Sequence, residues 1–233
     1  MAQVSIMRGI KVVFFDAAGT LLHLPRSVGF HYAEVAARHG WNADAGSLQC
    51  AFVEAWRVAP PPAASRGPRA DDDRGWWRAV VAEVMAKCGA PPGLDGTALF
   101  ADLYAEFTRP GVWELYLEVP EVLAALAKRY RLGVLSNFDG RLRRILAQLG
   151  ILNCFEHLVI SSEVGADKPH PWIFEAALAC AGIAPHEALL VGDDAACDVE
   201  GARLAGWHAF HVERPAITLR DLLPALNAGP CGS

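Results

Sequence analysis

Short hydrophobic runs recur along the second half of the chain, and longer stretches with apolar residues at helical spacing separate them. A similar run, rich in β-branched and aromatic residues, stands near the N-terminus. Short runs without polar alternation are typical of parallel strands buried on both faces. The expected strands are 10–15, 131–136, 157–160, 188–192 and 207–212, with helices at 120–130, 140–150, 172–181 and 198–205. This regular order predicts an α/β fold with a doubly wound parallel sheet and right-handed crossovers.

A long, mostly helical stretch at 30–107 separates the first predicted strand from the second. It is broken at 59–68, where several prolines cannot continue a helix and a loop is expected. The pattern therefore predicts a helical insert in an α/β core. We expect residues 1–22 and 111–233 to form the core domain, and 23–110 to form the helical one.

Composition narrows the range of partners. The 233 residues carry 21 Lys and Arg against 26 Asp and Glu, a net charge of −5, and no basic stripe is visible. Nucleic acid and acidic membranes are therefore not expected partners, whereas a small molecule is. No apolar run approaches the length of a membrane span, and the first residues do not resemble a secretion signal. We expect a soluble, cytoplasmic protein, either a monomer or a homodimer.

Six cysteines are scattered along the chain without Cys-x-x-Cys pairs. This spacing favours buried free thiols over a zinc site or a disulfide framework.

Polar residues follow four of the predicted strands. In doubly wound sheets, ligands bind beyond the carboxyl ends of the strands, so these residues are expected to line one crevice. The crevice would hold a nucleophile, hydroxyls, an ammonium and a group of carboxylates, as attack on a Mg²⁺-bound phosphoryl group requires. The residues are Asp16 and Thr20, Ser136 and Asn137, Lys168, and Asp193, Asp194 and Asp198.

Each of these residues also has a purely structural interpretation. A single aspartate such as Asp16 can serve a turn, and the Ser136–Asn137 pair can cap the following helix. Lys168 can be a solvated loop charge. Asp193, Asp194 and Asp198 can be acids in the first turn of a helix. A further acidic run, 71–73, is expected to cap a helix that begins near Arg74.

The same residues resemble the four motifs of the haloacid dehalogenase (HAD) superfamily. The matching segments are Asp16-x-x-Gly19-Thr20, Ser136, Lys168-Pro169, and Gly192-Asp193-Asp194 with Asp198. Ser136-Asn137-Phe138-Asp139 is also similar to a segment of the HAD-like hydrolase domain-containing proteins. The resemblance implies a Rossmann-like core with an inserted helical cap domain that closes over the site and selects substrate.

The resemblance also implies roles for individual residues. Asp16 would be the nucleophile and would become an aspartyl-phosphate. Mg²⁺ would be bound by Asp16, the backbone carbonyl of Ala18 and Asp193, with help from Asp194 or Asp198. Thr20, Ser136 and Lys168 would bind the phosphoryl oxygens, and Asn137 would also contact the substrate.

Ala18 departs from the phosphatase pattern. Phosphatases similar to this chain have an aspartate there, which protonates the leaving alcohol and later activates water. Because alanine does neither, we expect a Mg²⁺-dependent phosphohydrolase of low or restricted activity on a small phosphorylated metabolite. A catalytically weak or inactive binding protein is the alternative. A 2-haloacid dehalogenase or an enzyme like phosphonoacetaldehyde hydrolase is a third. The latter uses a Schiff-base lysine in its cap, and the residues around Lys87, the only lysine between Val12 and Ala127, do not resemble that motif.

Overall fold

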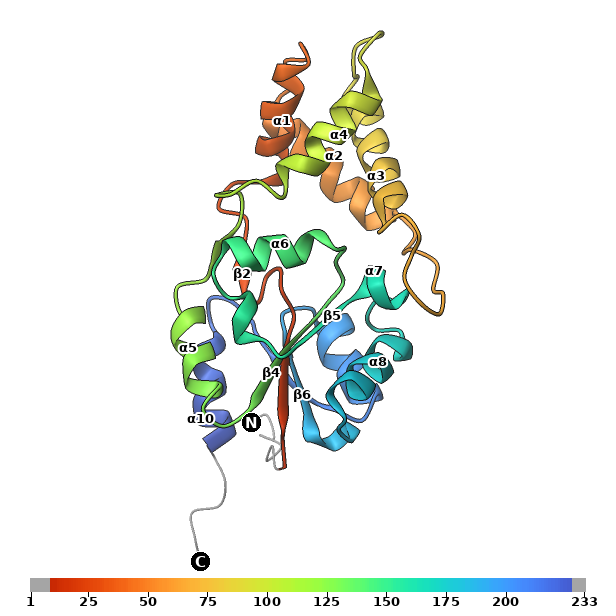
Figure 1. Cartoon of the computed structure of the whole chain (residues 1–233). Coiled ribbons are helices and arrows are strands. Elements are labelled where there is room, and N and C mark those ends of the chain that lie inside the picture. The colour runs from red at the N-terminus through yellow and green to blue at the C-terminus, as the bar shows by residue number, and fades with distance from the viewer. Residues whose placement is uncertain (1–8, 228–233) are drawn as a thin grey trace, which may run out of the picture. The chain divides into compact units, whose positions relative to one another are not determined.

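A five-stranded sheet lies at the centre of the larger of two units (Figure 1). This computed structural model describes residues 9–227. The strands are β1 (Val12–Phe15), β4 (Arg131–Ser136), β5 (His157–Ile160), β6 (Ala188–Gly192) and β7 (His208–His211), in the order β5-β4-β1-β6-β7. All neighbouring strands are parallel, which confirms the predicted α/β sheet. Because β1 is central, the residue that follows it emerges in the middle of the carboxyl edge.

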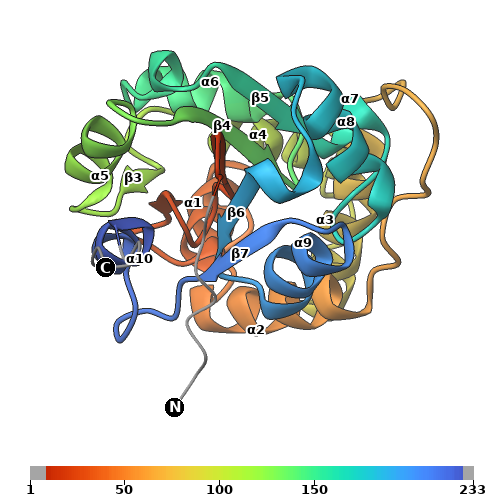
Figure 2. The ribbon, with the colours of Figure 1, turned by 90° about the horizontal axis from the view of Figure 1, so that it is seen from below.

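Helices cover both faces of this sheet. Figure 2 shows α5 (Val119–Leu126) and α10 (Leu222–Asn227) on one side, and α8 (Pro171–Ala181) and α9 (Gly201–Leu204) on the other. The remaining elements of this part of the chain are α6 (Arg141–Gln148), α7 (Ser161–Val164), the 3₁₀ helices η1 (Leu152–Cys154), η2 (Pro185–Glu187) and η4 (Leu219–Asp221), and the π-helix η3 (Ala195–Glu200). A short second sheet pairs β2 (Leu22–His23) with β3 (Glu114–Leu115).

The alternation of side chains along β1 divides the apolar core between the two faces. Val12 and Phe14 belong to a cluster with residues of α8 and with Trp207, and the rings of Phe14 and Trp207 lie 5.2 Å apart. The neighbouring strand carries Gly133 beside this ring, where a Cβ atom would overlap with Phe14. A small residue in β4 therefore lets a large one in β1 fill the core.

The helical unit comprises 24–62 and 70–114. It contains α1 (Val28–Arg38), α2 (Ala45–Val58), α3 (Arg74–Lys87) and α4 (Gly96–Glu106), which share one apolar core. Asp44 and Asp95 begin α2 and α4 by accepting hydrogen bonds from backbone N–H groups of the first turn. The expectation of a helical stretch is thus confirmed, whereas its role as a cap stays a prediction.

Residues 63–69 fall within the predicted helical domain but group with the sheet unit. The segment is irregular, as the prolines predicted, and its backbone is bonded along α7. The N–H groups of Ser65, Gly67 and Arg69 donate to the carbonyls of Gly165, Val164 and Ser162 at 2.8, 3.2 and 2.8 Å. A Cβ atom on Gly165 would overlap with the carbonyl oxygens of Ser65 and Gly67, so only glycine permits this approach.

Two local expectations need correction. The predicted helix 198–205 starts earlier, because the Asp194 carboxylate accepts hydrogen bonds from Ala196 and Cys197 and begins η3 there. The expected burial of the cysteines is also wrong. The five described cysteines are free, but Cys50, Cys154 and Cys180 are exposed and Cys88 and Cys197 are partly so; Cys231 lies outside the described residues. Within residues 9–227, no helix combines the length and the apolar character that crossing a bilayer requires.

Candidate active site

Asp16 lies at the carboxyl end of β1 and is buried. Its backbone N–H donates to the carbonyl of Val191 in β6, which continues the sheet pairing to this residue. Its side-chain oxygen Oδ1 accepts hydrogen bonds from Ser136 Oγ at 3.1 Å and from Lys168 Nζ at 2.7 Å. Both donors bind the same oxygen, so the carboxylate is held by one group at the end of β4 and by another from the loop between α7 and α8.

Lys168 is buried and bridges two carboxylates. Its ammonium lies 2.7 Å from Asp16 Oδ1 and 2.6 Å from Asp198 Oδ1. Burial alone would lower the pKa of Lys168, but the attraction of Asp16 and Asp198 outweighs it and raises this pKa above its ordinary value. The side chain is therefore a fixed cation, and the interpretation of Lys168 as a solvated loop charge is wrong.

Three of the predicted aspartates form one group at the sheet edge. Each of Asp16, Asp193 and Asp198 offers a carboxylate oxygen, and these oxygens lie within 4.8 Å of one another. Asp198 is buried, and burial raises the pKa of its carboxyl while Lys168 opposes the rise. The Asp193 carboxyl also has a raised pKa, because it is partly desolvated and Asp16 repels its charge.

Asp194 has a different role in this structure. Its carboxylate accepts from the N–H groups of Ala196 and Cys197 at 2.8 Å each, while its own N–H donates to Asp198 Oδ2 at 3.0 Å. It therefore caps η3 and positions Asp198. It stands at the N-cap and not, as the structural interpretation expects, in the first turn of the helix.

The donors and charges of this group fit a hard divalent cation. Three carboxylates face one ammonium, a formal excess of two negative charges, and carboxylate and carbonyl oxygens are the ligands that Mg²⁺ prefers. In the adjacent turn, the carbonyls of Ala17, Gly19 and Thr20 all accept hydrogen bonds. No such bond to the Ala18 carbonyl is found among the described residues, so this oxygen can still bind a ligand.

Thr20 and Gly19 bring this turn close to Asp193. The Thr20 hydroxyl donates to Asp193 Oδ1 at 2.9 Å, so in this structure it orients a carboxylate. Gly19 has φ +92°, and a Cβ atom there would overlap with the Asp193 carboxylate. Glycine is therefore required at this position, both for its backbone conformation and for space.

Asn137 contacts the backbone of Lys168. Its Nδ2 donates to the Lys168 carbonyl at 2.9 Å, and its Oδ1 accepts from the Lys168 N–H at 2.6 Å. Neither Ser136 nor Asn137 caps α6, since that helix begins at Arg141 with Gly140 as its N-cap, so the capping interpretation is wrong. Asn137 joins the loops after β4 and β5, and its contact with a substrate stays a prediction.

Comparison with known proteins identifies the family. A haloacid dehalogenase-like hydrolase model matches residues 10–206. The chain is also 33% identical to mouse haloacid dehalogenase-like hydrolase domain-containing protein 3 over 94% of its own length and 91% of the relative's. The chain belongs to the haloacid dehalogenase-like hydrolase family. A phosphoserine phosphatase of Thermus thermophilus is 42% identical over 58% of this HAD-like hydrolase and 53% of the relative.

Solved structures share the fold of this HAD-like hydrolase. A defluorinating L-2-haloacid dehalogenase, Rha0230, superposes with a TM-score of 0.78 at 19% identity and covers 94% of this chain and 96% of its own. The magnesium-bound HAD-hydrolase YfnB of Bacillus subtilis gives 0.76 at 16% identity and covers 94% and 100%. At these identities the likeness concerns the fold alone, and dehalogenases and other hydrolases share it.

The hydrogen bonds of this HAD-like hydrolase also involve residues whose roles the sequence does not indicate. Arg69 Nη2 donates to Asp167 Oδ2 at 2.6 Å, which ties the segment 63–69 to the residue before Lys168. An arginine in a proline-rich loop carries no local signal of such a partner. Gly192, in contrast, belongs to one of the recognised motifs. The structure gives the reason for glycine there, since a Cβ atom would overlap with the Asp198 side chain.

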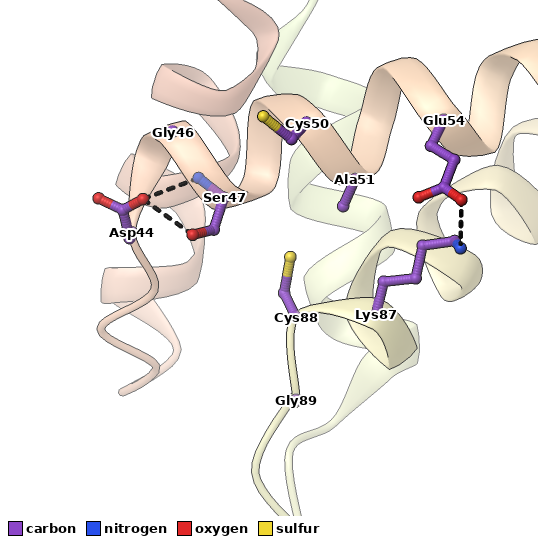
Figure 3. Close-up of a pocket in the computed structure, with 9 residues that line it drawn as sticks. All are labelled: Asp44, Gly46, Ser47, Cys50, Ala51, Glu54, Lys87, Cys88 and Gly89. Atoms are coloured by element: carbon purple, nitrogen blue, oxygen red, sulfur yellow. Dashed lines mark hydrogen bonds and ion pairs between the residues drawn. The ribbon is translucent and has the colours of Figure 1, made fainter.

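Lys87, the lysine considered for Schiff-base chemistry, lies in a groove of the helical unit beside Cys88 (Figure 3). Its ammonium pairs with Glu54 at 3.3 Å and with Glu83 at 3.4 Å. The hydrogen bond with Glu54, more than any other effect, raises the pKa of Lys87. A Schiff-base lysine needs a lowered pKa to be a free amine, so this environment does not favour that role.

Proposed function

We propose that this HAD-like hydrolase is a Mg²⁺-dependent phosphohydrolase that uses Asp16 as its nucleophile. The observation that carries the proposal is the environment of Asp16. Its carboxylate is oriented by Lys168 and Ser136 and lies within 4.8 Å of the oxygens of Asp193 and Asp198. This arrangement combines a fixed nucleophile, a buried cation and a carboxylate group, as phosphoryl transfer requires.

In the first step, an oxygen of Asp16 attacks the phosphorus, and the bond from phosphorus to the leaving oxygen breaks with its electron pair on that oxygen. The Asp16 oxygen that does not bind Lys168 and Ser136 is suited to this attack. The ammonium of Lys168 and the hydroxyl of Ser136 stabilise the negative charge on the transferring group. In the second step, water attacks the phosphorus, and the bond from phosphorus to the Asp16 oxygen breaks with its electron pair on that oxygen, which restores the carboxylate. The water's proton passes to the released phosphate or to solvent, and this step should be slow because Ala18 offers no base.

Asp16, Asp193 and the Ala18 carbonyl would hold Mg²⁺, with Asp198 or Asp194 next to it. When bound, the ion would neutralise the excess negative charge and shield the anionic substrate from these carboxylates. Thr20 contributes by orienting Asp193.

Ala18 limits the substrates on which this site can act. An alkoxide leaving group needs a proton that no side chain at position 18 can supply. General acid–base catalysis contributes about 10²–10⁴-fold, so alkyl phosphates should react slowly, while aryl and acyl phosphates need little protonation. We therefore propose a small phosphorylated metabolite with a good leaving group as the substrate. The cytoplasmic location and a monomeric or dimeric state, without nucleic-acid or membrane partners, stay predictions.

The test is Mg²⁺-dependent phosphate release from acetyl phosphate, p-nitrophenyl phosphate and a panel of alkyl phosphates. We expect activity on the first two that Asp16→Asn abolishes. Ala18→Asp should extend activity to the alkyl phosphates by about 10²-fold or more, because it restores an acid. Mass spectrometry of acid-quenched protein should find the phosphoryl group on Asp16.

The alternative of a catalytically inactive binding protein is favoured by the same alanine. It predicts that no phosphoryl donor labels Asp16, in the parent or in Ala18→Asp. Dehalogenation predicts halide release from a 2-halo acid in the presence of a chelator. We consider it the weaker proposal, because Asp193 and Asp198 without a cation would repel a carboxylate substrate.

A further inference from the structure

Arg214, in the segment after β7, reaches the turn that follows β1. Its Nη2 donates to the carbonyl of Thr20 at 3.0 Å, and its Nε donates to that of Gly19 at 3.4 Å. On its other side, Nη1 forms an ion pair with Glu118 at 2.6 Å, and the guanidinium lies over the ring of Tyr116, 3.4 Å from the ring centroid. One side chain thus joins four residues of the sheet unit.

The two carbonyls that Arg214 binds belong to the turn of the candidate active site. Thr20 is fully buried, so its carbonyl needs a partner within the protein. The hydroxyl of the same residue donates to Asp193. Thr20 is therefore held from two directions, with its backbone on Arg214 and its side chain on a carboxylate of the aspartate group.

The geometry requires an arginine. A planar guanidinium can bind two adjacent carbonyls along one edge, pair with a carboxylate at another nitrogen and stack on an aromatic ring. The ammonium of lysine is a compact charge that cannot make these contacts together. Glu118 and Tyr116 in turn hold the guanidinium, since both the Arg214 and Glu118 side chains are largely buried.

We infer that Arg214 is a positioning residue of the proposed phosphohydrolase site. It fixes the turn so that the Ala18 carbonyl and the Thr20 hydroxyl are in place for the aspartate group and its cation. The inference rests on the proposed function as far as the cation is concerned. That Arg214 holds the turn in one conformation does not depend on the proposed function.

The first measurement is amide hydrogen exchange of the parent, Arg214→Met, Arg214→Lys and Arg220→Met, all without metal. Arg220 is the matched control, because its ion pair with Glu121 is exposed and involves no residue of this turn. We expect the turn amides of Gly19 and Leu22 to exchange about tenfold faster in Arg214→Met, with amides of β4 and β6 unchanged. The exchange rates of these amides in Arg214→Lys should lie between those of the parent and of Arg214→Met. The rates in Arg220→Met should match those of the parent.

The second measurement is Mg²⁺ binding by calorimetry on the same proteins. We expect the dissociation constant to rise about tenfold in Arg214→Met and less in Arg214→Lys, because a mobile turn must be ordered when the ion binds. Arg220→Met should again match the parent.

Unchanged exchange in the turn of Arg214→Met would overturn the inference, and so would faster exchange spread evenly over the strands, which indicates general destabilisation. If Arg214→Met does not fold, Arg214→Lys decides by the same comparison. A parent that binds no Mg²⁺ would remove the proposed function, while the exchange data would still decide whether Arg214 orders the turn.

Discussion

At the scale of the residue, the candidate site depends on side chains that orient other side chains. Asn137 is the clearest case, because both polar groups of its amide bind the backbone of Lys168. Its position after β4 was predictable from the sequence. Its partner was not, because the predicted crevice brings this residue and the Lys168 loop to one edge of the sheet but does not indicate which side-chain and backbone groups meet there.

Asn137→Ala should reduce the rate of phosphate release from acetyl phosphate. Two hydrogen bonds of about 1 kcal/mol each hold the loop that carries Lys168, and their loss should lower kcat by about tenfold or more. The measurement is steady-state kinetics, with Asn153→Ala in η1 as an exposed control. A rise in KM at constant kcat would instead assign Asn137 to substrate binding.

At the scale of the element, β4, β5 and β6 begin and end where the hydrophobic runs predict, because buried parallel strands have no polar alternation to blur their limits. The start of η3 and the short strands β2 and β3 were not predicted. The first depends on the cap at Asp194, and two-residue strands leave no periodic signal.

The acidic run before α3 gives a prediction at this scale. The carboxylate that accepts from the first turn is that of Asp71, which binds the N–H of Gly75 at 2.8 Å. Asp71→Ala should lower the free energy of unfolding by about 1 kcal/mol in urea denaturation, because the N–H group loses its acceptor. Asp71→Asn keeps an acceptor oxygen and should cost little. Equal losses in both variants would assign the effect to charge.

At the scale of the whole molecule, a carboxylate that would bind the metal ion should lower the stability of the metal-free fold. The raised pKa of Asp193 arises from its desolvation and from repulsion by Asp16, so the ionised carboxylate destabilises the metal-free protein, by an amount that solvent screening of this exposed residue keeps small. Asp193→Asn should therefore melt at a higher temperature than the parent in chelator. The exposed Glu200→Gln serves as the control for removal of one charge.

Mg²⁺ should reverse that order. A ligand at a concentration of about 100 times its dissociation constant stabilises the folded state by about 2.7 kcal/mol. The parent and Glu200→Gln should gain this stabilisation fully, and Asp193→Asn should gain less. Differential scanning calorimetry with and without Mg²⁺ provides the measurement. If Asp193→Asn gains as much as the parent, Asp193 is not a ligand of the ion.

The path of the chain also bears on how this protein can be engineered. It leaves the sheet unit after residue 23, returns for 63–69, leaves again, and returns at 115. The helical unit thus consists of two separate inserts, which the segment 63–69 (the strap) joins along α7. It therefore cannot be removed or exchanged as one continuous segment. A chimera that replaces 24–114 by the insert of a relative would also remove the strap, with its bonds to Gly165 and Asp167 next to Lys168. Grafts that keep 63–69 native should preserve the support of that lysine loop.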